Sequence, residues 1–253
     1  GRAAYLSAPY AAPRDYQETS GLNSNQIAGQ ELPPGWTMNW TAAQWFVPAG
    51  AWEYQGLAPI EAIAKIAAAG GAYVQADRQA DLITVLPRYP SAPWTWDQAN
   101  ADYQLPRDLI LQRGSTKKPG QGKNGVFVHG GTTGGILARV VRQGSAGDKL
   151  LPTIVDPLIT DTQPATERGI QALAGTTRQS NEQHELPISS SLGGLILPGR
   201  IVAVGADNSG TFAENWRGLV NGVTVSAQAA RAGDKGVNLK VRQTLDIERH
   251  FEE

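Results

Sequence analysis

The strongest periodic pattern in the chain lies in the segment PIEAIAKIAAAGG, residues 59–71. Apolar side chains recur there at the spacing i, i+3, i+4, i+7, at Ile60, Ile63, Ala64 and Ala67. This spacing places them along one face of an α-helix. A proline suits the first helical turn, where its missing N–H would have no intrahelical partner, and the final glycines favour a stop. We therefore predict a helix over residues 59–71 with Ile63 and Ile66 buried.

Two other segments have weaker helical patterns. The segment NSNQIAGQEL, residues 23–32, has a capping residue in Asn23 or Ser24 and is followed by two prolines, which end a helix. The segment ATERGIQALAGTTR, residues 165–178, has the helical period but contains two glycines, which lower helix stability. We predict one short helix in each segment.

Strand patterns occupy most of the remaining chain. Residues 73–75 and 82–86 lie on either side of a polar turn and predict a hairpin directly after the 59–71 helix. Six further strands are predicted at residues 125–129, 136–142, 182–188, 200–204, 216–227 and 238–248. The 29 glycines and 16 prolines divide the chain into short pieces, which is typical of antiparallel β structure with many turns.

The last two strands have the most regular alternation of apolar and polar residues. Apolar positions are Val223, Val225, Leu239, Val241, Leu245 and Ile247, and polar positions include Thr224, Ser226, Lys240, Arg242, Thr244, Asp246 and Glu248. Period-two alternation gives each strand one apolar and one polar face. We predict a long hairpin whose apolar face fills a barrel and whose polar face meets solvent, a channel or a neighbouring subunit. Arg242 and Asp246 are its candidate interface residues.

The periodicity lapses between residues 87 and 104, around RYPSAPWTWDQAN. We predict a domain boundary there. Residues 1–95 would form a small α/β module of helices and a β-hairpin, and residues 96–253 an antiparallel, β-barrel-like domain with one helix. The predicted fold class is α+β, mostly antiparallel β.

The glycine-rich segment HGGTTGGILARV, residues 129–140, raises the question of a phosphate-binding loop. A Walker loop has a lysine and a serine or threonine after its last glycine, whereas Ile136 and Leu137 follow here. A dinucleotide-binding glycine motif opens a helix, whereas this one precedes a β-rich segment. We therefore predict a hairpin connection and no bound nucleotide.

The sequence contains no recognised catalytic or metal-binding constellation. His129, His184 and His250 have no ligand partners at metal-site spacings, and there is no G-x-S-x-G motif. The chain has no cysteine, which removes disulfides and thiolate sites. Carboxylates are scattered, so glycosidase chemistry stays open although no pair stands out. We predict no enzyme activity, no catalytic residue, no metal and no cofactor.

Composition indicates a globular chain, since 41% of the 253 residues are hydrophobic and 18% are charged. The formal net charge of −1 argues against specific nucleic-acid binding, which needs a concentrated basic face. The densest basic stretch, STKKPGQGK at residues 115–123, is interpreted as a solvated loop. No apolar run approaches the length of a membrane helix, so we expect no membrane insertion. The chain begins at Gly1 rather than Met, and we expect it to be part of something longer.

Tryptophan is the one compositional oddity, because six of the seven lie in the first hundred residues: Trp36, Trp40, Trp45, Trp52, Trp94 and Trp96. Such side chains stack on sugars, form protein interfaces or anchor the core of a small domain. The alternation in GWTMNW favours the core for Trp36 and Trp40. Trp94 and Trp96 stay open as interface candidates.

Three segments follow one another in a characteristic order. They are residues 48–90 with the helix and hairpin described above, residues 197–204 with LPGRIVAV, and residues 216–250 with WRGLVNGVTVSAQ and VRQTLDIERH. Their motifs and order resemble the tail hub, or baseplate hub, proteins of tailed bacteriophages. The resemblance covers most of the chain, and the order of the motifs is more specific than any one of them.

This resemblance implies a non-enzymatic virion structural protein, located in the virion tail and assembled in the bacterial host cytoplasm. It implies a homotrimeric ring that joins the tail tube to the tip or spike and lets DNA pass, with tube-like β-barrels as pseudo-sixfold adaptors. Hub proteins usually have a barrel before the helix–hairpin module. This chain begins too close to the module to hold one, so that barrel lies upstream or is assembled differently.

The tryptophans leave one alternative from a different class of protein. The chain would then be a carbohydrate-binding or glycan-hydrolysing module of a phage or bacterial surface protein. A trimeric mass or a ring favours the hub, whereas glycan binding or polysaccharide cleavage favours the alternative.

Overall fold

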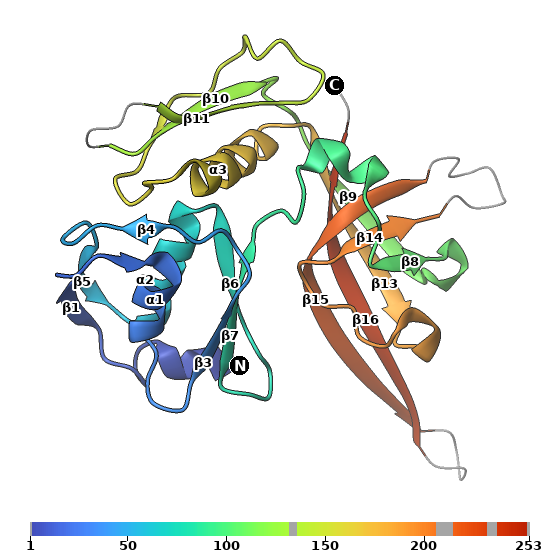
Figure 1. Cartoon of the computed structure of the whole chain (residues 1–253). Helices are drawn as coiled ribbons and strands as arrows, with labels where there is room; N and C mark the ends of the chain where they lie inside the picture. The colour runs from blue at the N-terminus through green and yellow to red at the C-terminus, as the bar shows by residue number, and fades with distance from the viewer. Residues whose placement is uncertain (1, 132–135, 206–214, 232–236, 252–253) are drawn as a thin grey trace. The chain divides into compact units, whose positions relative to one another are not determined.

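The computed structural model describes residues 2–131, 136–205, 215–231 and 237–251, and it confirms the α+β class predicted from the sequence (Figure 1). Strands outnumber helices in these residues, and most paired strands are antiparallel. The chain divides into two compact units, and each is built from two segments. The first unit contains Gly1–Pro90 and Lys123–Gly175, and the second contains Ser91–Gly122 and Thr176–Glu253.

This division differs from the single boundary expected near residue 95. Residues 123–175 return to the first unit because their apolar side chains complete its core. Val128, Leu158, Ile159 and Ala165 are buried in one cluster with Ile63 of the helix–hairpin module. Hydrophobic periodicity shows that such residues are buried, but it does not show which other segment covers them.

Within the described residues, the first unit has three helices and four small sheets. The helices are α1 (Ser24–Gln30), α2 (Pro59–Ala69) and α3 (Thr162–Ala174), and a 3-10 turn, η1 (Arg2–Leu6), precedes them. The two-stranded sheets are β1 (Arg14–Gln17) with β5 (Glu53–Leu57), and β2 (Leu22–Asn23) with β4 (Phe46–Val47). The three-stranded sheets are β3 (Thr37–Trp40), β7 (Leu82–Pro87) and β6 (Ala72–Ala76), and β11 (Ile136–Val141), β10 (Gly125–His129) and β12 (Ile154–Val155).

Helix α2 forms at the predicted place, and its start and stop have clear local causes. The Glu61 carboxylate accepts the backbone N–H of Ala58 at 2.8 Å, which satisfies one of the free donors at the helix start. Gly71 follows the helix with a φ of 73°, which favours glycine. A Cβ at Gly71 would also lie 2.8 Å from the backbone of α3. Glycine is therefore required there for both conformation and close packing.

The buried face of α2 is the predicted one with one exception. Ile63 and Ile66 are 0% and 1% exposed, which confirms their predicted burial. Ala64, predicted on the apolar stripe, is exposed, and Ala62 is buried instead. A helical wheel locates a stripe only to about one residue, because the direction of the core is set by the neighbouring elements.

The other two helices agree with prediction in type and differ at their ends. Helix α1 starts after Asn23, whose N–H donates to the Gln26 side chain at 2.9 Å. Helix α3 begins at Thr162, three residues before the expected start, because Asp161 caps it by accepting the N–H of Gln163 at 2.9 Å. Pro164 lies in the first turn, where a missing N–H costs nothing.

The glycine-rich segment joins two paired strands. Strands β10 and β11 pair antiparallel, with Gly125 opposite Val141 and Val128 opposite Ala138. The pairing supports a hairpin connection, although residues 132–135 of the connection lie outside the described residues. No helix follows the glycines, so the geometry of a dinucleotide-binding turn is absent from β10 and β11 as described.

The second unit is built on one six-stranded sheet (Figure 1). Its strands run in the order β8 (Tyr103–Leu105), β14 (Ile201–Val204), β15 (Trp216–Arg231), β16 (Val237–His250), β13 (Gln179–Pro187) and β9 (Gln112–Lys118). Among the described strands of this sheet, β8 and β14 pair parallel and the other neighbours pair antiparallel. Three 3-10 turns accompany the sheet: η2 (Pro93–Gln98), η3 (Arg107–Leu109) and η4 (Ser190–Leu192).

This sheet curls but does not close into a barrel among the described strands. Its edge strands β8 and β9 are consecutive in the chain, and only residues 106–111 join them. The link contains the 3-10 turn η3, which shortens it, so it cannot span a flat six-stranded sheet roughly 24 Å wide and the two edges lie closer together than that. No pairing joins β8 to β9 in the described residues, so the expected barrel is an open, curled sheet.

Strand β9 corrects the interpretation of the basic stretch 115–123 as a loop. Residues 112–118 are paired with β13 along its length, with Thr116 opposite Asn181. Every residue of β9 is exposed, so its polar sequence lacked the apolar alternation that marks a strand. Pairing with the neighbouring strand β13 outweighs the weak β propensity of these residues.

The predicted long hairpin is present as β15 and β16, which are paired from Leu219–Glu248 to Arg231–Val237. Their apolar face joins a buried cluster that includes Leu186, Val220, Leu245 and Ile247. None of the helices in the described residues combines the length and hydrophobicity needed to span a membrane.

Candidate assembly surface

One face of the six-stranded sheet is polar over four neighbouring strands, and we call it the polar sheet face. Cross-strand partners share one face of a sheet, so the register defines its members. They are Gln112, Gly114, Thr116 and Lys118 of β9; Gln179, Asn181, Gln183 and Glu185 of β13; Lys240, Arg242, Thr244, Asp246 and Glu248 of β16; and Gly222, Thr224, Ser226 and Gln228 of β15. The opposite face of β13, β15 and β16 contributes side chains to the apolar core, whereas β9 is exposed on both faces.

Charge on the polar sheet face is balanced in the described residues. Lys118, Lys240 and Arg242 are its cations, and Glu185, Asp246 and Glu248 are its anions. Arg242 forms an ion pair with Glu185 on the neighbouring strand. A mixed face of this kind does not build the single-sign field that attracts nucleic acid.

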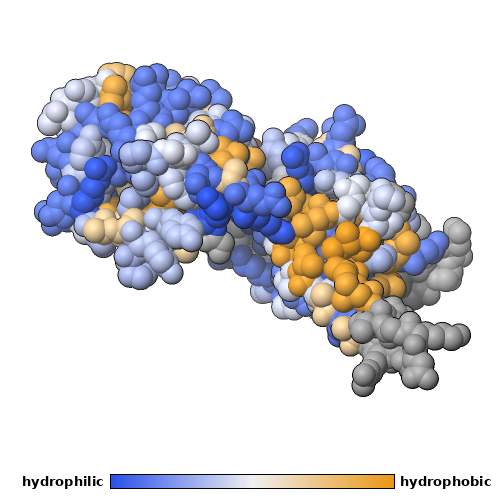
Figure 2. All heavy atoms as spheres, turned by 90° about the horizontal axis from the view of Figure 1, so that it is seen from below, coloured by the Kyte–Doolittle hydropathy of each residue, from blue (hydrophilic) through white to orange (hydrophobic). Residues whose placement is uncertain are grey.

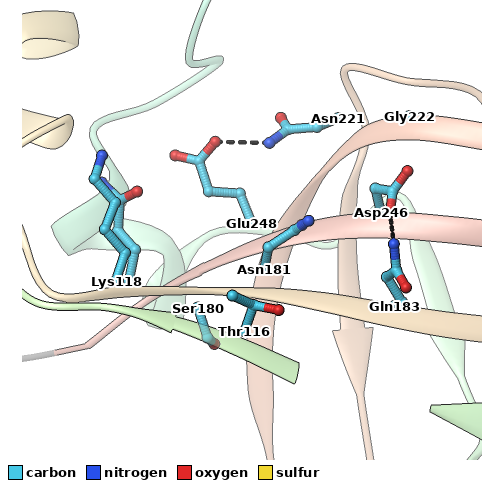
Figure 3. Close-up of a pocket in the computed structure, with 10 residues that line it drawn as sticks. Thr116, Lys118, Ser180, Asn181, Gln183, Asn221, Gly222, Asp246 and Glu248 are labelled. Carbon is cyan, nitrogen blue, oxygen red and sulfur yellow. Dashed lines mark hydrogen bonds between the residues drawn. The ribbon is translucent and has the colours of Figure 1, made fainter. Parts of the chain in front are cut away.

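A shallow hollow of about 550 Å³ lies on this face (Figure 3). Glycines contribute to it, because the row Gly114, Gln183, Asp246 and Gly222 begins and ends with a residue that has no side chain. A Cβ at Gly114 would meet Gln183 only at 3.9 Å, and a Cβ at Gly222 would lie 3.2 Å from the Asp246 carboxylate. Larger residues at these two positions would fill the hollow.

Hydrogen bonds fix the side chains that line the hollow. Gln183 donates to the Asp246 carboxylate at 2.9 Å, and Asn221 donates to the Glu248 carboxylate at 2.8 Å. Both hydrogen bonds are drawn as dashed lines in Figure 3. Asn221 is the extra residue of a bulge in β15, between Val220 and Gly222. The bulge directs its amide towards Glu248, which is a common use of a bulge at a functional or structural site.

Glu248 also takes part in a buried chain of polar groups at the end of β16. The His250 Nε2 lies 2.7 Å from Glu248 Oε1, and its Nδ1 lies 2.6 Å from the Thr177 hydroxyl. A hydroxyl, an imidazole and a carboxylate in this order also occur in hydrolases. Here the hydroxyl belongs to a threonine that is 3% exposed, so a substrate cannot reach it. We interpret these hydrogen-bonded polar groups as an anchor for the C-terminal strand β16.

The other two histidines have structural surroundings as well. Burial lowers the pKa of His184 to about 4, and its ring packs against Trp216 with centroids 5.7 Å apart. His129 accepts the backbone N–H of Gly131 at 2.9 Å. The described residues contain no group of three His, Cys, Asp or Glu side chains that could hold a metal ion.

The four predicted interface residues lie in different surroundings. Arg242 and Asp246 are both on the polar sheet face, on β16. Trp94 is half-buried in η2. Trp96 is 2% exposed, donates its indole N–H to the Ser91 carbonyl at 3.1 Å and contacts the His250 ring. A buried indole cannot present its face to a partner, so the structure gives Trp96 a core position instead.

Sequence reasoning missed the part of the surface that β9 and β13 contribute. Thr116, Asn181 and Gln183 line the hollow, but they stand in short polar segments with no motif. Their position depends on the pairing of β9 with β13 and of β13 with β16. The two glycines in polar strand sequence were the only local signal, since glycine within a strand marks a place of close approach or missing side-chain volume.

The fold is similar to that of two solved tail proteins. The chain is similar to the tail protein of Neisseria meningitidis MC58, with a TM-score of 0.57 and 14% sequence identity over 98% of this chain and 72% of that one. It is similar to the 43 kDa tail protein of prophage MuSo2 from Shewanella oneidensis, with a TM-score of 0.56 and 17% identity over the same shares.

The resemblance to phage tail proteins inferred from the sequence is confirmed at the level of the fold, over almost the whole chain. No protein-family model matches the sequence, and no curated protein matches it. The likeness is therefore carried by the arrangement of elements and not by sequence identity.

Proposed function

We propose that the chain is a structural component of a bacteriophage or prophage tail. In this proposal it forms a homotrimeric hub ring between the tail tube and the tip or spike, and the ring lets DNA pass. The observation that carries the proposal is the shared fold with two solved tail proteins over 98% of the chain. The protein would be located in the virion tail, after assembly in the host cytoplasm, without enzymatic activity.

The polar sheet face supports this proposal in its chemistry. A surface between subunits of a large assembly, or along a channel, has to tolerate water and lie close to other polar groups. The face offers amides, hydroxyls and balanced charges. Balanced charge suits passage of DNA, because a strongly basic lining would hold the phosphates.

The test is to locate the chain and determine its stoichiometry in particles. Purified protein is measured by light scattering and imaged by negative-stain microscopy, and particles carrying an epitope-tagged chain are labelled with antibody. The proposal expects three copies, ring-shaped particles and label where the tube meets the tip. Label on the capsid, or a chain absent from particles, would overturn the tail role. A different copy number would overturn only the trimer.

The described residues give the carbohydrate alternative no support. The tryptophans that supported it are buried or half-buried, with Trp45, Trp52 and Trp96 each at most 3% exposed. The acidic residues of the hollow already accept hydrogen bonds from neighbouring amides. A glycan-array screen of the purified chain separates the two functions, since the hub proposal expects no specific glycan binding.

A further inference from the structure

One oxygen of the Asp246 carboxylate is open to the hollow on the polar sheet face. Gln183 donates to its Oδ1 at 2.9 Å, and no described residue donates to its Oδ2. Gly222 lies beside that oxygen on β15, where a Cβ would be only 3.2 Å from it. A side chain at position 222 would cover the oxygen, so the glycine leaves it accessible from the hollow.

The backbone does not account for the two glycines at the ends of this row of residues. Neither Gly114 nor Gly222 has a positive φ, and a Cβ at Gly114 would make only an ordinary contact, 3.9 Å from Gln183. Glycine within a strand weakens the strand and often marks a place where a ligand or another backbone approaches closely. The two glycines therefore provide open volume beside Gln183 and Asp246.

The open polar atoms at this end of the hollow are hydrogen-bond acceptors. An amide that donates its NH₂ group to a carboxylate turns its own oxygen away from that carboxylate, and Gln183 does so beside Asp246. No described residue donates to the Gln183 Oε1. Because Gln183 and Asp246 are direct cross-strand partners, their open oxygens lie side by side on one face.

The cations of the polar sheet face do not neutralise this end of the hollow. Lys118 and Asp246 are paired with positions four residues apart on β13, which is a distance of roughly 13 Å along a strand. Figure 3 shows the two side chains at opposite sides of the hollow. Arg242 forms its ion pair with Glu185. Glu248 is 8% exposed, so Asp246 is the accessible carboxylate of the hollow.

The hollow lies on the opposite face of β15 and β16 from the exposed apolar side chains of these strands. Val225, Leu239 and Val241 are exposed, and the register places them on the face that also carries the core residue Leu245. Figure 2 shows hydrophobic side chains gathered on the surface of the second unit. Recognition in the hollow therefore depends on charge and hydrogen bonds and not on apolar burial.

We propose that the hollow receives an arginine side chain from another protein of the tail, with Asp246 Oδ2 and Gln183 Oε1 as its acceptors. A guanidinium group carries five N–H donors in one plane, which suits two acceptors that lie side by side. Its positive charge strengthens the hydrogen bond to the carboxylate. The inference rests on the proposed tail function, which supplies the neighbouring protein, and it adds the chemistry by which the polar sheet face recognises that neighbour.

The test is a titration of the full-length, isotope-labelled chain with a blocked Gly-Arg-Gly peptide, followed by amide NMR. The proposal expects saturable shifts at Gln183, Gly222 and Asp246, with weak affinity because a single side chain supplies only part of an interface. A peptide with citrulline in place of arginine keeps the shape of the side chain and lacks its charge. It should bind at least about tenfold more weakly, since charged hydrogen bonds are the stronger ones.

Two variants separate the hollow from the rest of the face. Asp246→Asn keeps the shape of the side chain but removes its charge, and it should weaken binding of the arginine peptide at least about tenfold. Glu185→Gln removes a carboxylate from the same face outside the hollow and should leave the affinity unchanged. Thermal melting of both variants verifies that the fold is intact.

Four results would each overturn the proposal. They are the absence of saturable shifts at the hollow, equal binding of the citrulline peptide, unchanged binding by Asp246→Asn, and an equal loss of binding in Glu185→Gln. None of them bears on the tail function, which is refuted instead by a chain that is absent from particles.

Discussion

Two neighbouring residues on α2 have opposite surroundings. Ile63 is fully buried in the core of the first unit, and Ala64 beside it is exposed. An aspartate at position 63 would place a charge without a partner in an apolar environment. We predict that Ile63→Asp lowers the free energy of unfolding by at least about 3 kcal/mol, measured by urea unfolding.

Ala64→Asp is the matched control for this substitution. It introduces the same charge one residue further along the same helix, on the side that faces solvent. The expected loss is below about 1 kcal/mol, which is the range of helix propensity. Equal unfolding curves for the two variants would mean that α2 does not pack through Ile63.

His184 makes the second unit sensitive to acid. Burial lowers its pKa from 6.5 to about 4, so the folded protein resists protonation there. Above pH 6.5 the imidazole is neutral in both states, and its contribution to stability is fully present. As the pH falls from 6.5 to 4, the unfolded chain takes up a proton that the folded chain does not. We predict that stability falls across this window, by an amount on the order of 3 kcal/mol when complete.

The variant His184→Gln separates this effect from that of the carboxylates. Asp77, Asp81 and Asp148 have pKa values held low by hydrogen bonds, so they also destabilise the folded state in acid. They titrate equally in parent and variant. The measurement is the free energy of unfolding at pH 7 and pH 4.5, and the variant should lose less between the two. If the parent and His184→Gln lose the same free energy of unfolding between pH 7 and pH 4.5, His184 is not the cause of the acid sensitivity.

Among the elements, the long hairpin combines a structural and a surface role. Its inward residues join the core, and its outward residues Arg242 and Asp246 lie on the polar sheet face. Both charges are partly solvated, and exposed charges contribute little to stability. We predict that Arg242→Glu and Asp246→Lys change the melting temperature by only a few degrees but reduce incorporation of the chain into tail particles.

Arg242 has a built-in control, because its ion-pair partner is Glu185. If Arg242→Glu lowers the stability, the double variant Glu185→Arg, Arg242→Glu should recover it. The double variant re-forms the ion pair with the two charges exchanged between the strands. Unfolding of the single variants, or normal incorporation into particles, would show that the face has been assigned the wrong role.

Element by element, the sequence predicted what depends on local periodicity. Helix α2 and the β6–β7 hairpin lie where predicted, since their patterns are long and their glycine and proline boundaries are clear. Strand β9 was missed because all its residues are exposed, and an exposed edge strand has no apolar alternation. The hollow on the polar sheet face escaped prediction for the same reason, since two strands of short polar sequence build much of it.

For the whole molecule, the shared core of residues 1–90 and 123–175 has a direct consequence. Trp45 donates its indole N–H to the Leu158 carbonyl at 2.8 Å, and Ile159 and Ala165 are fully buried in the same cluster. We predict that a fragment of residues 1–95 lacks a cooperative unfolding transition, because it leaves one side of its core exposed. Circular dichroism and thermal melting of the fragment test this.

The matched fragment joins residues 1–90 to residues 123–175 through a flexible Gly-Ser linker. It keeps the complete buried cluster and should unfold cooperatively. A folded fragment of residues 1–95 would instead support the boundary expected from the sequence. If neither fragment unfolds cooperatively, the first unit needs the remaining chain in order to fold.

The sequence alone determined which segments are helices, which long strands have one apolar face, and that the chain resembles phage tail proteins. These features rest on periodicity and on turn residues, which act within a few positions of the chain. The tertiary structure decided that residues 123–175 join the first unit, that Trp96 is buried, and that the apolar face of β15 and β16 continues past its own sheet. Periodicity states that a face is apolar, but the partner that covers it is set by contacts between segments far apart in the chain. Towards the far end of β15 and β16, those contacts end before the apolar face does.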